Sequence, residues 1–269
     1  MELKRKDLQD LKPYTVESVN ADIILDANES FIKYWPEIMQ EAYNAISEIN
    51  LTRYPRDNYK KICDSYGDYI GVGGEKIVAG DGSDELINII LNTFLNKGDK
   101  LGTIEPDFVM YHVFSKIRAV DKVNVYSRKS DGIDIRQLIQ NINNSGCKIF
   151  MFSNPNNPTG RIIKKQEIRE IVSSVSCLVV VDEAYMEFAN ESVKDLIDEY
   201  NNLMVLRTCS KGLGLAAIRL GFCLCNEKLR YELLKVKPPY NISCVTTAIG
   251  NVILNKKELI QENINFVIE

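Results

Sequence analysis

The sequence has very little histidine and no long apolar run. Among its 269 residues there is one histidine, His112. A single imidazole excludes a metal site built from several histidines, and it would have to serve any Ser-His-Asp triad alone. His112 lies within an apolar pattern of helical period, so we interpret it as an ordinary packed side chain. The longest apolar stretches, such as 149–152 and 177–181, are far shorter than the roughly 18 residues of a membrane span.

The chain also lacks basic runs and CxxC pairs. It has 33 Lys and Arg against 37 Asp and Glu, a net charge of −4, and no basic stripe that could hold a nucleic-acid backbone. The seven cysteines are scattered, mostly inside apolar runs, which predicts reduced core thiols. Residues 1–10 are too charged for a signal peptide. These features predict a cytoplasmic protein without a metal, a nucleic-acid partner or a membrane partner.

Short β-rich runs alternate with longer segments of helical period. The strands are predicted at 76–79, 100–104, 122–126, 148–152, 178–182, 203–207 and 220–225. The helices are predicted at 35–49, 58–70, 84–96, 107–118, 135–143, 165–175 and 191–200. This alternation predicts an α/β three-layer sandwich, in which helices cover both faces of a mostly parallel sheet. Ligands are expected at the carboxyl ends of its strands.

No linker or repeat divides the chain. We therefore expect an N-terminal arm over 1–30 and one large domain over 31–242. A further helical stretch begins at Ser243, and the sequence stops within it at Glu269. Its apolar positions need a covering segment, and none follows. We expect 243–269 to be the start of a helix that leads to a small domain absent from this chain.

A lysine among small residues follows the strand predicted at 203–207. Burial there would lower the pKa of Lys211 and make its amine a candidate for Schiff-base formation. Thr208, Ser210 and Arg219 supply two hydroxyls and a cation, a set suited to a phosphate dianion. A flexible glycine-rich loop with a solvated lysine explains this segment equally well when it is taken alone.

Other polar residues also follow predicted strands. Asp182 ends an apolar run, which predicts a buried carboxylate. The protonated nitrogen of a pyridine ring would be a suitable cationic partner for it. An Asp at the end of a strand is, however, more often a metal ligand or a helix cap. Two X-Pro steps and a glycine make 153–160 a rigid turn that can orient an Asn amide. Residues 80–85 join a strand to a helix, where backbone N–H groups can bind phosphate or Ser83 can simply cap the helix.

Together these motifs resemble those of the fold-type-I pyridoxal-phosphate aminotransferases in order and spacing. They are GSD at 82–84, NPTG at 157–160, DEAY at 182–185, and SK at 210–211 followed by Arg219. Three further segments resemble the histidinol-phosphate aminotransferase family: LDANE at 25–29, RYP at 53–55 and PPYN at 238–241. The likeness runs from about Leu11 to the C-terminus.

The resemblance implies roles for the residues around the cofactor ring. Lys211 would bind pyridoxal phosphate as a Schiff base and later carry a proton between substrate and cofactor. Asp182 would pair with the pyridine nitrogen, and Asn157 and Tyr185 with the 3-oxygen of the ring. Tyr111 would stack on the ring.

The resemblance also implies the contacts of the phosphate and the substrate. The phosphate would be held by the backbone amides of Ser83 and Asp84 and by the side chains of Thr208, Ser210 and Arg219. Tyr54 would reach the phosphate bound by a neighbouring subunit, which implies a homodimer with shared active sites. Tyr14 and Asn28 would contact the substrate.

The implied reaction belongs to histidine biosynthesis and exchanges an amino group between histidinol phosphate and 2-oxoglutarate. Two alternatives stay open: an enzyme similar to threonine-phosphate decarboxylase, and a non-catalytic protein that retains pyridoxal phosphate. Family members continue into a small C-terminal domain whose arginines clamp the substrate. No such segment follows Glu269 in this sequence, which implies incomplete substrate recognition and impaired turnover.

Overall fold

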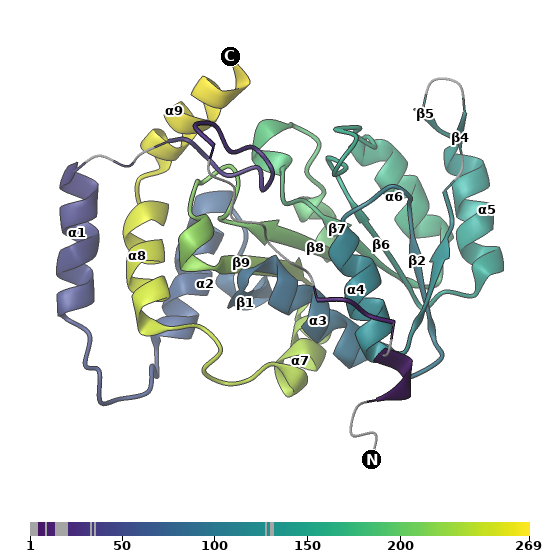
Figure 1. Ribbon diagram of the computed structural model, residues 1–269, viewed down its shortest axis with the longest axis horizontal. Helices are drawn as coiled ribbons and strands as arrows, with labels where there is room; N and C mark the ends of the chain where they lie inside the picture. The colour runs from purple at the N-terminus through teal and green to yellow at the C-terminus, as the bar shows by residue number, and fades with distance from the viewer. Residues whose placement is uncertain are drawn as a thin grey trace.

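A seven-stranded sheet forms the centre of the computed structural model, which describes residues 5–8, 10–13, 21–32, 34, 36–126, 128–129 and 132–269 (Figure 1). The strand order is β1-β9-β8-β7-β6-β2-β3. The strands are β1 (Ile77–Asp81), β2 (Lys100–Thr103), β3 (Asp121–Asn124), β6 (Ile149–Ser153), β7 (Leu178–Asp182), β8 (Leu203–Thr208) and β9 (Leu220–Cys225). In this sheet β9 runs antiparallel to its neighbours β1 and β8, and all other pairs of neighbouring strands are parallel. The predicted mostly parallel sheet is confirmed.

Helices cover both faces of the sheet, as expected for a three-layer sandwich. They are α1 (Pro36–Ser47), α2 (Asn58–Ile70), α3 (Gly82–Phe94), α4 (Val109–Arg118), α5 (Ile135–Ser145), α6 (Lys165–Ser174), α7 (Glu227–Val236), α8 (Cys244–Leu254) and α9 (Lys257–Ile268). One core joins α2, α5, α6 and α8 to one face of the sheet, and a second core joins α3, α4 and α7 to the other. Alternate residues of β7 divide between them, since Val179 and Val181 belong to the first core and Leu178 and Val180 to the second.

Three details of local structure differ from the prediction. The helix predicted at 191–200 is only a short 3-10 helix, Lys194–Asp198. Its start is held instead by the carboxylate of Glu183, which accepts hydrogen bonds from the Val193 N–H and the Ser192 hydroxyl. The helix α7 was not predicted, although Asn226 caps its Leu229 N–H with the side chain, a signal that the sequence does contain. A small hairpin of β4 (Arg128–Lys129) and β5 (Gly132–Ile133) was also not predicted.

The C-terminal segment forms two helices rather than the start of one. α8 packs against α1 and α2, and Ile253 of α8 and Ile260 of α9 are buried in the same core. Packing within this core therefore covers most of the apolar positions of 243–269, for which the sequence had suggested a missing covering segment. Phe266, near the end of α9, stays 65% exposed and contacts the ring of Phe31.

Composition-based expectations can also be compared with the described residues. All seven cysteines are described, none forms a disulfide, and all except Cys244 are buried, which confirms the prediction of unpaired core thiols. No helix in the described part of the chain has the length and apolar character of a membrane span. Within the same residues, no group of three or more acidic, histidine or cysteine side chains is arranged to hold a metal ion.

Candidate active site

A cavity of about 640 Å³ lies where β7 and β8 end and α3 and β9 begin. Because β9 runs antiparallel to β8, its first residues lie at the edge where the parallel strands end. This arrangement brings Arg219, just before β9, next to Lys211, just after β8. The predicted site residues that line the cavity are Asn28, Ser83, Asp84, Asn157, Asp182, Tyr185, Thr208, Ser210, Lys211 and Arg219.

Lys211 projects into this cavity from the loop after β8. Its Nζ donates a hydrogen bond to the carbonyl of Ala27, 2.5 Å away, and lies 5.9 Å from the centre of the Tyr185 ring. Burial lowers the pKa of the Lys211 amine, while the negative charges of Glu29 and Asp84 oppose this shift. A lowered pKa increases the unprotonated fraction of the amine, which is the nucleophilic form.

Asp182 is a buried carboxylate at the end of β7. It is 3% exposed and accepts hydrogen bonds from the Tyr111 hydroxyl at 2.8 Å and from the Ala184 N–H at 3.1 Å. Burial raises the pKa of Asp182 to about 6, although both hydrogen bonds favour the ionised form. No described side chain forms an ion pair with Asp182. The carboxylate can therefore accept a cationic group from a ligand.

The start of α3 and the residues around Arg219 form an anion-binding end of the cavity. Asp81, the N-cap residue of α3, makes no side-chain cap hydrogen bond, and the Thr208 and Ser210 hydroxyls lie 3.0 Å apart. The chain approaches itself closely here, since a Cβ on Gly221 would lie 2.5 Å from the Ser83 nitrogen. Helix N–H groups, two hydroxyls and the Arg219 guanidinium together suit a phosphate.

Tyr111 does not have the position that the family resemblance implied. Its side chain is 1% exposed and belongs to the core between α3, α4 and the sheet, behind Asp182. Phe108 lines the cavity instead, and its ring meets the Tyr111 ring edge-on at 5.7 Å. Phe108 is the N-cap residue of α4, whereas Tyr111 lies inside the first turn and faces the core. The sequence placed both aromatic residues in one short motif and did not distinguish them.

Asp107 and Ser153 also line the cavity and were not predicted as site residues. Asp107 accepts hydrogen bonds from the Ser153 N–H at 3.1 Å, from the Ser153 hydroxyl, and from the Phe108 N–H at 2.8 Å. Burial raises the pKa of Asp107 to about 7. These bonds attach the start of α4 to the end of β6, and they fix the position of Phe108.

A buried network of charged groups lies beneath the cavity. The Arg207 guanidinium binds the carboxylates of Glu183 and Glu187, each at 2.8 Å, and its Nε donates to the Tyr66 hydroxyl at 3.4 Å. Glu183 directly follows Asp182, and Arg207 directly precedes Thr208. The network therefore joins the ends of β7 and β8. Glu183 was part of a recognised motif, but nothing in the sequence indicated its partner.

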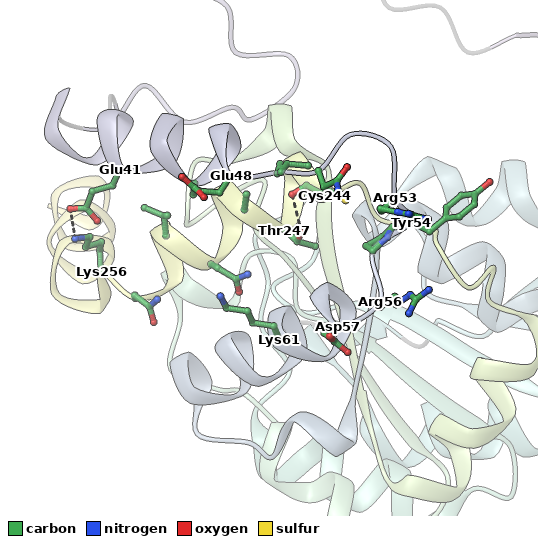
Figure 2. Close-up of a pocket in the computed structure, with 18 residues that line it drawn as sticks. Glu41, Glu48, Arg53, Tyr54, Arg56, Asp57, Lys61, Cys244, Thr247 and Lys256 are labelled. Atoms are coloured by element: carbon green, nitrogen blue, oxygen red, sulfur yellow. Dashed lines mark hydrogen bonds and ion pairs between the residues drawn. The ribbon is translucent and has the colours of Figure 1, made fainter.

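The remaining predicted residues lie at the rim or outside this cavity. Asn28 donates from its side-chain amide to the Tyr185 hydroxyl at 3.0 Å. Tyr54 is 74% exposed and stacks on Tyr240, with ring centres 4.6 Å apart. Figure 2 shows that Tyr54, with Arg53 and Arg56, lines a second cavity beside α1, α2 and α8. Contact of Tyr54 with a neighbouring subunit stays a prediction, and Tyr14 lies outside the described residues.

Comparison with known proteins identifies the class of this chain. The family model "Aminotransferase class I and II" matches residues 22–268. A histidinol-phosphate aminotransferase from Clostridium novyi is 46% identical over 99% of this chain and 75% of that protein. One from Clostridium kluyveri is 43% identical over 97% of this chain and 75% of that protein. The crystal structure of histidinol-phosphate aminotransferase from Sinorhizobium meliloti in complex with pyridoxal-5'-phosphate has a TM-score of 0.81 at 20% identity, and covers 89% of this chain and 66% of that one.

The chain belongs to the class I and II aminotransferases, which are pyridoxal-phosphate-dependent enzymes, and within them to the family of histidinol-phosphate aminotransferases. The resemblance inferred from the motifs is thereby confirmed. Enzymes of this class act on amino compounds and oxo acids and usually form dimers. The chain spans about three quarters of the length of the two curated relatives named above.

Proposed function

We propose that this chain binds pyridoxal phosphate through Lys211 and transfers an amino group between histidinol phosphate and 2-oxoglutarate. It performs this reaction in the cytoplasm, as part of histidine biosynthesis. It acts as a homodimer with shared active sites. The observation that carries the proposal is one cavity that combines an amine, a buried carboxylate and an anion-binding end. Pyridoxal phosphate offers an aldehyde, a ring nitrogen and a phosphate, which are the groups that these three elements bind. The 46% identity to a histidinol-phosphate aminotransferase supports the choice of substrate.

The residues present fit this cofactor. The carboxylate of Asp182 is buried without a cationic partner among the described side chains, so a protonated ring nitrogen would offset the cost of its charge. Gly82 has a φ of +78°, and a Cβ at this position would lie 2.4 Å from an Arg219 nitrogen. Glycine at this position therefore lets the guanidinium approach the start of α3. Phe108, rather than Tyr111, would face the cofactor ring.

Each of the main site residues would then have a defined role. Lys211 would hold the cofactor through its unprotonated amine and would move a proton at the substrate α-carbon. Asn157 and Tyr185, whose hydroxyl accepts from the Asn28 amide, would orient the ring through its 3-oxygen. Asp182 would keep the ring nitrogen protonated. When bound, pyridoxal phosphate supplies an electron sink for the electrons released at the substrate α-carbon. In this proposal, residues 31–242 form the cofactor-binding domain.

The cofactor part of the proposal is tested by mapping the modified lysine. The 269-residue chain is incubated with pyridoxal phosphate, reduced with borohydride and digested, and the labelled peptide is sequenced. We expect the label on Lys211 and loss of visible absorption in Lys211→Ala. Lys237→Ala is a matched control, because burial also lowers the pKa of Lys237 but this residue lies outside the cavity. A label on Lys237 would overturn the assignment.

The substrate part is tested by adding amino compounds to the cofactor-loaded chain. We expect histidinol phosphate and glutamate to change the visible spectrum, and 2-oxoglutarate to reverse the change made by glutamate. Release of carbon dioxide from threonine phosphate would instead support the decarboxylase alternative. A cofactor spectrum that no amino compound changes would support a non-catalytic binding protein. Either result would overturn the proposed reaction but would leave the assignment of the cofactor site unchanged.

A further inference from the structure

Tyr111 does not line the cavity, but it is hydrogen-bonded to Asp182, which does. The Tyr111 hydroxyl donates to Oδ2 of Asp182 at 2.8 Å, and the Ala184 N–H donates to Oδ1 at 3.1 Å. Each carboxylate oxygen thus has one fixed partner, and a lone pair remains for a group in the cavity. Tyr111 is 1% exposed among apolar side chains, so its hydroxyl is shielded from bulk solvent.

We propose that Tyr111 is a positioning residue that keeps the Asp182 carboxylate ionised and oriented toward the cofactor nitrogen. The inference rests on the proposed cofactor site. It differs from the stacking role that the family resemblance implied for Tyr111. It also links two functions of α4, because Phe108 at the start of this helix lines the cavity and Tyr111 one turn later holds the carboxylate.

The chemistry of a phenol explains why tyrosine suits this position. Burial raises the pKa of the Tyr111 hydroxyl well above its usual range, and nearby carboxylates raise it further, so the proton stays on the phenol. The phenol therefore stabilises the Asp182 carboxylate while remaining neutral. A lysine or arginine here would neutralise the carboxylate and compete with the ring nitrogen for it. A phenylalanine would leave the carboxylate with the Ala184 N–H alone, and burial would then favour protonation.

The first experiment compares two tyrosine variants in pyridoxal-phosphate binding. Tyr111→Phe removes only the hydroxyl, and we expect about tenfold weaker cofactor binding, the order of effect of one hydrogen bond to a charged group. Tyr59→Phe is the matched control, since its hydroxyl accepts from the Ala79 N–H and lies away from the cavity. We expect less than a twofold change there. Equal cofactor affinity in wild type and Tyr111→Phe would overturn the inference.

A double-mutant cycle tests whether Tyr111 acts through Asp182. In an Asp182→Asn background, Tyr111→Phe should have no further effect on cofactor affinity. Additive losses would show a purely structural role and would overturn the inference. In the cofactor-free protein, nuclear magnetic resonance of the Asp182 carboxyl carbon should show a higher pKa in Tyr111→Phe, and an unchanged pKa would also contradict it. If wild type itself fails to load Lys211, the proposed function fails instead, so the two failures are distinguishable.

Discussion

The floor of the cavity and the outer face around Tyr54 differ in how their polar groups are held. In the floor, Asp182, Glu183 and Arg207 are nearly or fully buried, and each binds partners from the same chain. On the outer face, Tyr54 is 74% exposed and Leu51 is 87% exposed, and the stacking partner of Tyr54 is itself an exposed tyrosine. These floor residues thus bind partners within one chain, whereas the outer face presents side chains that can still contact a second subunit. Removing a group should therefore cost far more in the floor than on the outer face.

The largest effect is expected for Arg207→Met. This change leaves the buried carboxylates of Glu183 and Glu187 without their cation, and one carboxylate oxygen of Glu187 already has no partner. We expect the free energy of unfolding to fall by about 3–5 kcal/mol. The solvent-exposed ion pair of Arg169 with Glu199 gives the matched control, because water screens this pair and Arg169→Met should lower the free energy of unfolding far less than Arg207→Met. Urea unfolding measures both, and similar losses would contradict the distinction between buried and exposed pairs.

A smaller effect is expected in the pH dependence of the cofactor-free protein. Folding raises the pKa of Asp182 from 3.8 to about 6, so the protonated carboxyl stabilises the fold at low pH. This contribution is complete below the unfolded pKa and is lost as the pH rises through about 6. The rise corresponds to about 3 kcal/mol. Asp182→Asn should therefore gain about that much stability relative to wild type between roughly pH 4 and pH 8.

The control for this titration is Asp121→Asn, which changes an exposed residue of β3. Its stability relative to wild type should stay nearly constant over the same pH range. Burial raises the pKa of the Asp107 carboxyl to about 7, and the charge of Asp182 raises it further, so Asp182→Asn also lowers the pKa of Asp107. The measured difference therefore reports the coupled titration of both carboxyls. A flat difference between wild type and Asp182→Asn would show that the floor tolerates the charge without a ligand.

The smallest effect is expected on the outer face, for Tyr54→Phe. If Tyr54 contacts the phosphate bound by a second subunit, losing its hydroxyl should weaken pyridoxal-phosphate binding by about 1 kcal/mol. Tyr43 is also an exposed tyrosine and lies on α1. Tyr43→Phe should not weaken pyridoxal-phosphate binding. The affinity for pyridoxal phosphate is measured for both variants and wild type, at protein concentrations above and below the dissociation constant of the dimer. A monomer with full cofactor affinity and activity would contradict the shared site.

The sequence predicted the sheet and most of the cavity because both depend on local patterns. Each strand of the main sheet appears in the sequence as a short β-rich run, and the polar residues at strand ends directly follow these runs. Since parallel strands end at the same edge, Asp182, Thr208 and Lys211 were expected close together. The helix predicted at 191–200 forms only as the 3-10 helix Lys194–Asp198, and the residues just before it bind Glu183, a contact that the apolar periodicity did not indicate.

Only the tertiary structure decided which polar and aromatic groups face one another. The sequence by itself determined the strand ends, the lysine loop and the glycines, because backbone preferences and apolar periodicity act over a few residues. It did not determine that Phe108 faces the cavity and Tyr111 the carboxylate, or that Arg207 binds Glu183 and Glu187. These pairings arise from burial, since a charge removed from water needs a partner and the packing of whole elements decides which one is near.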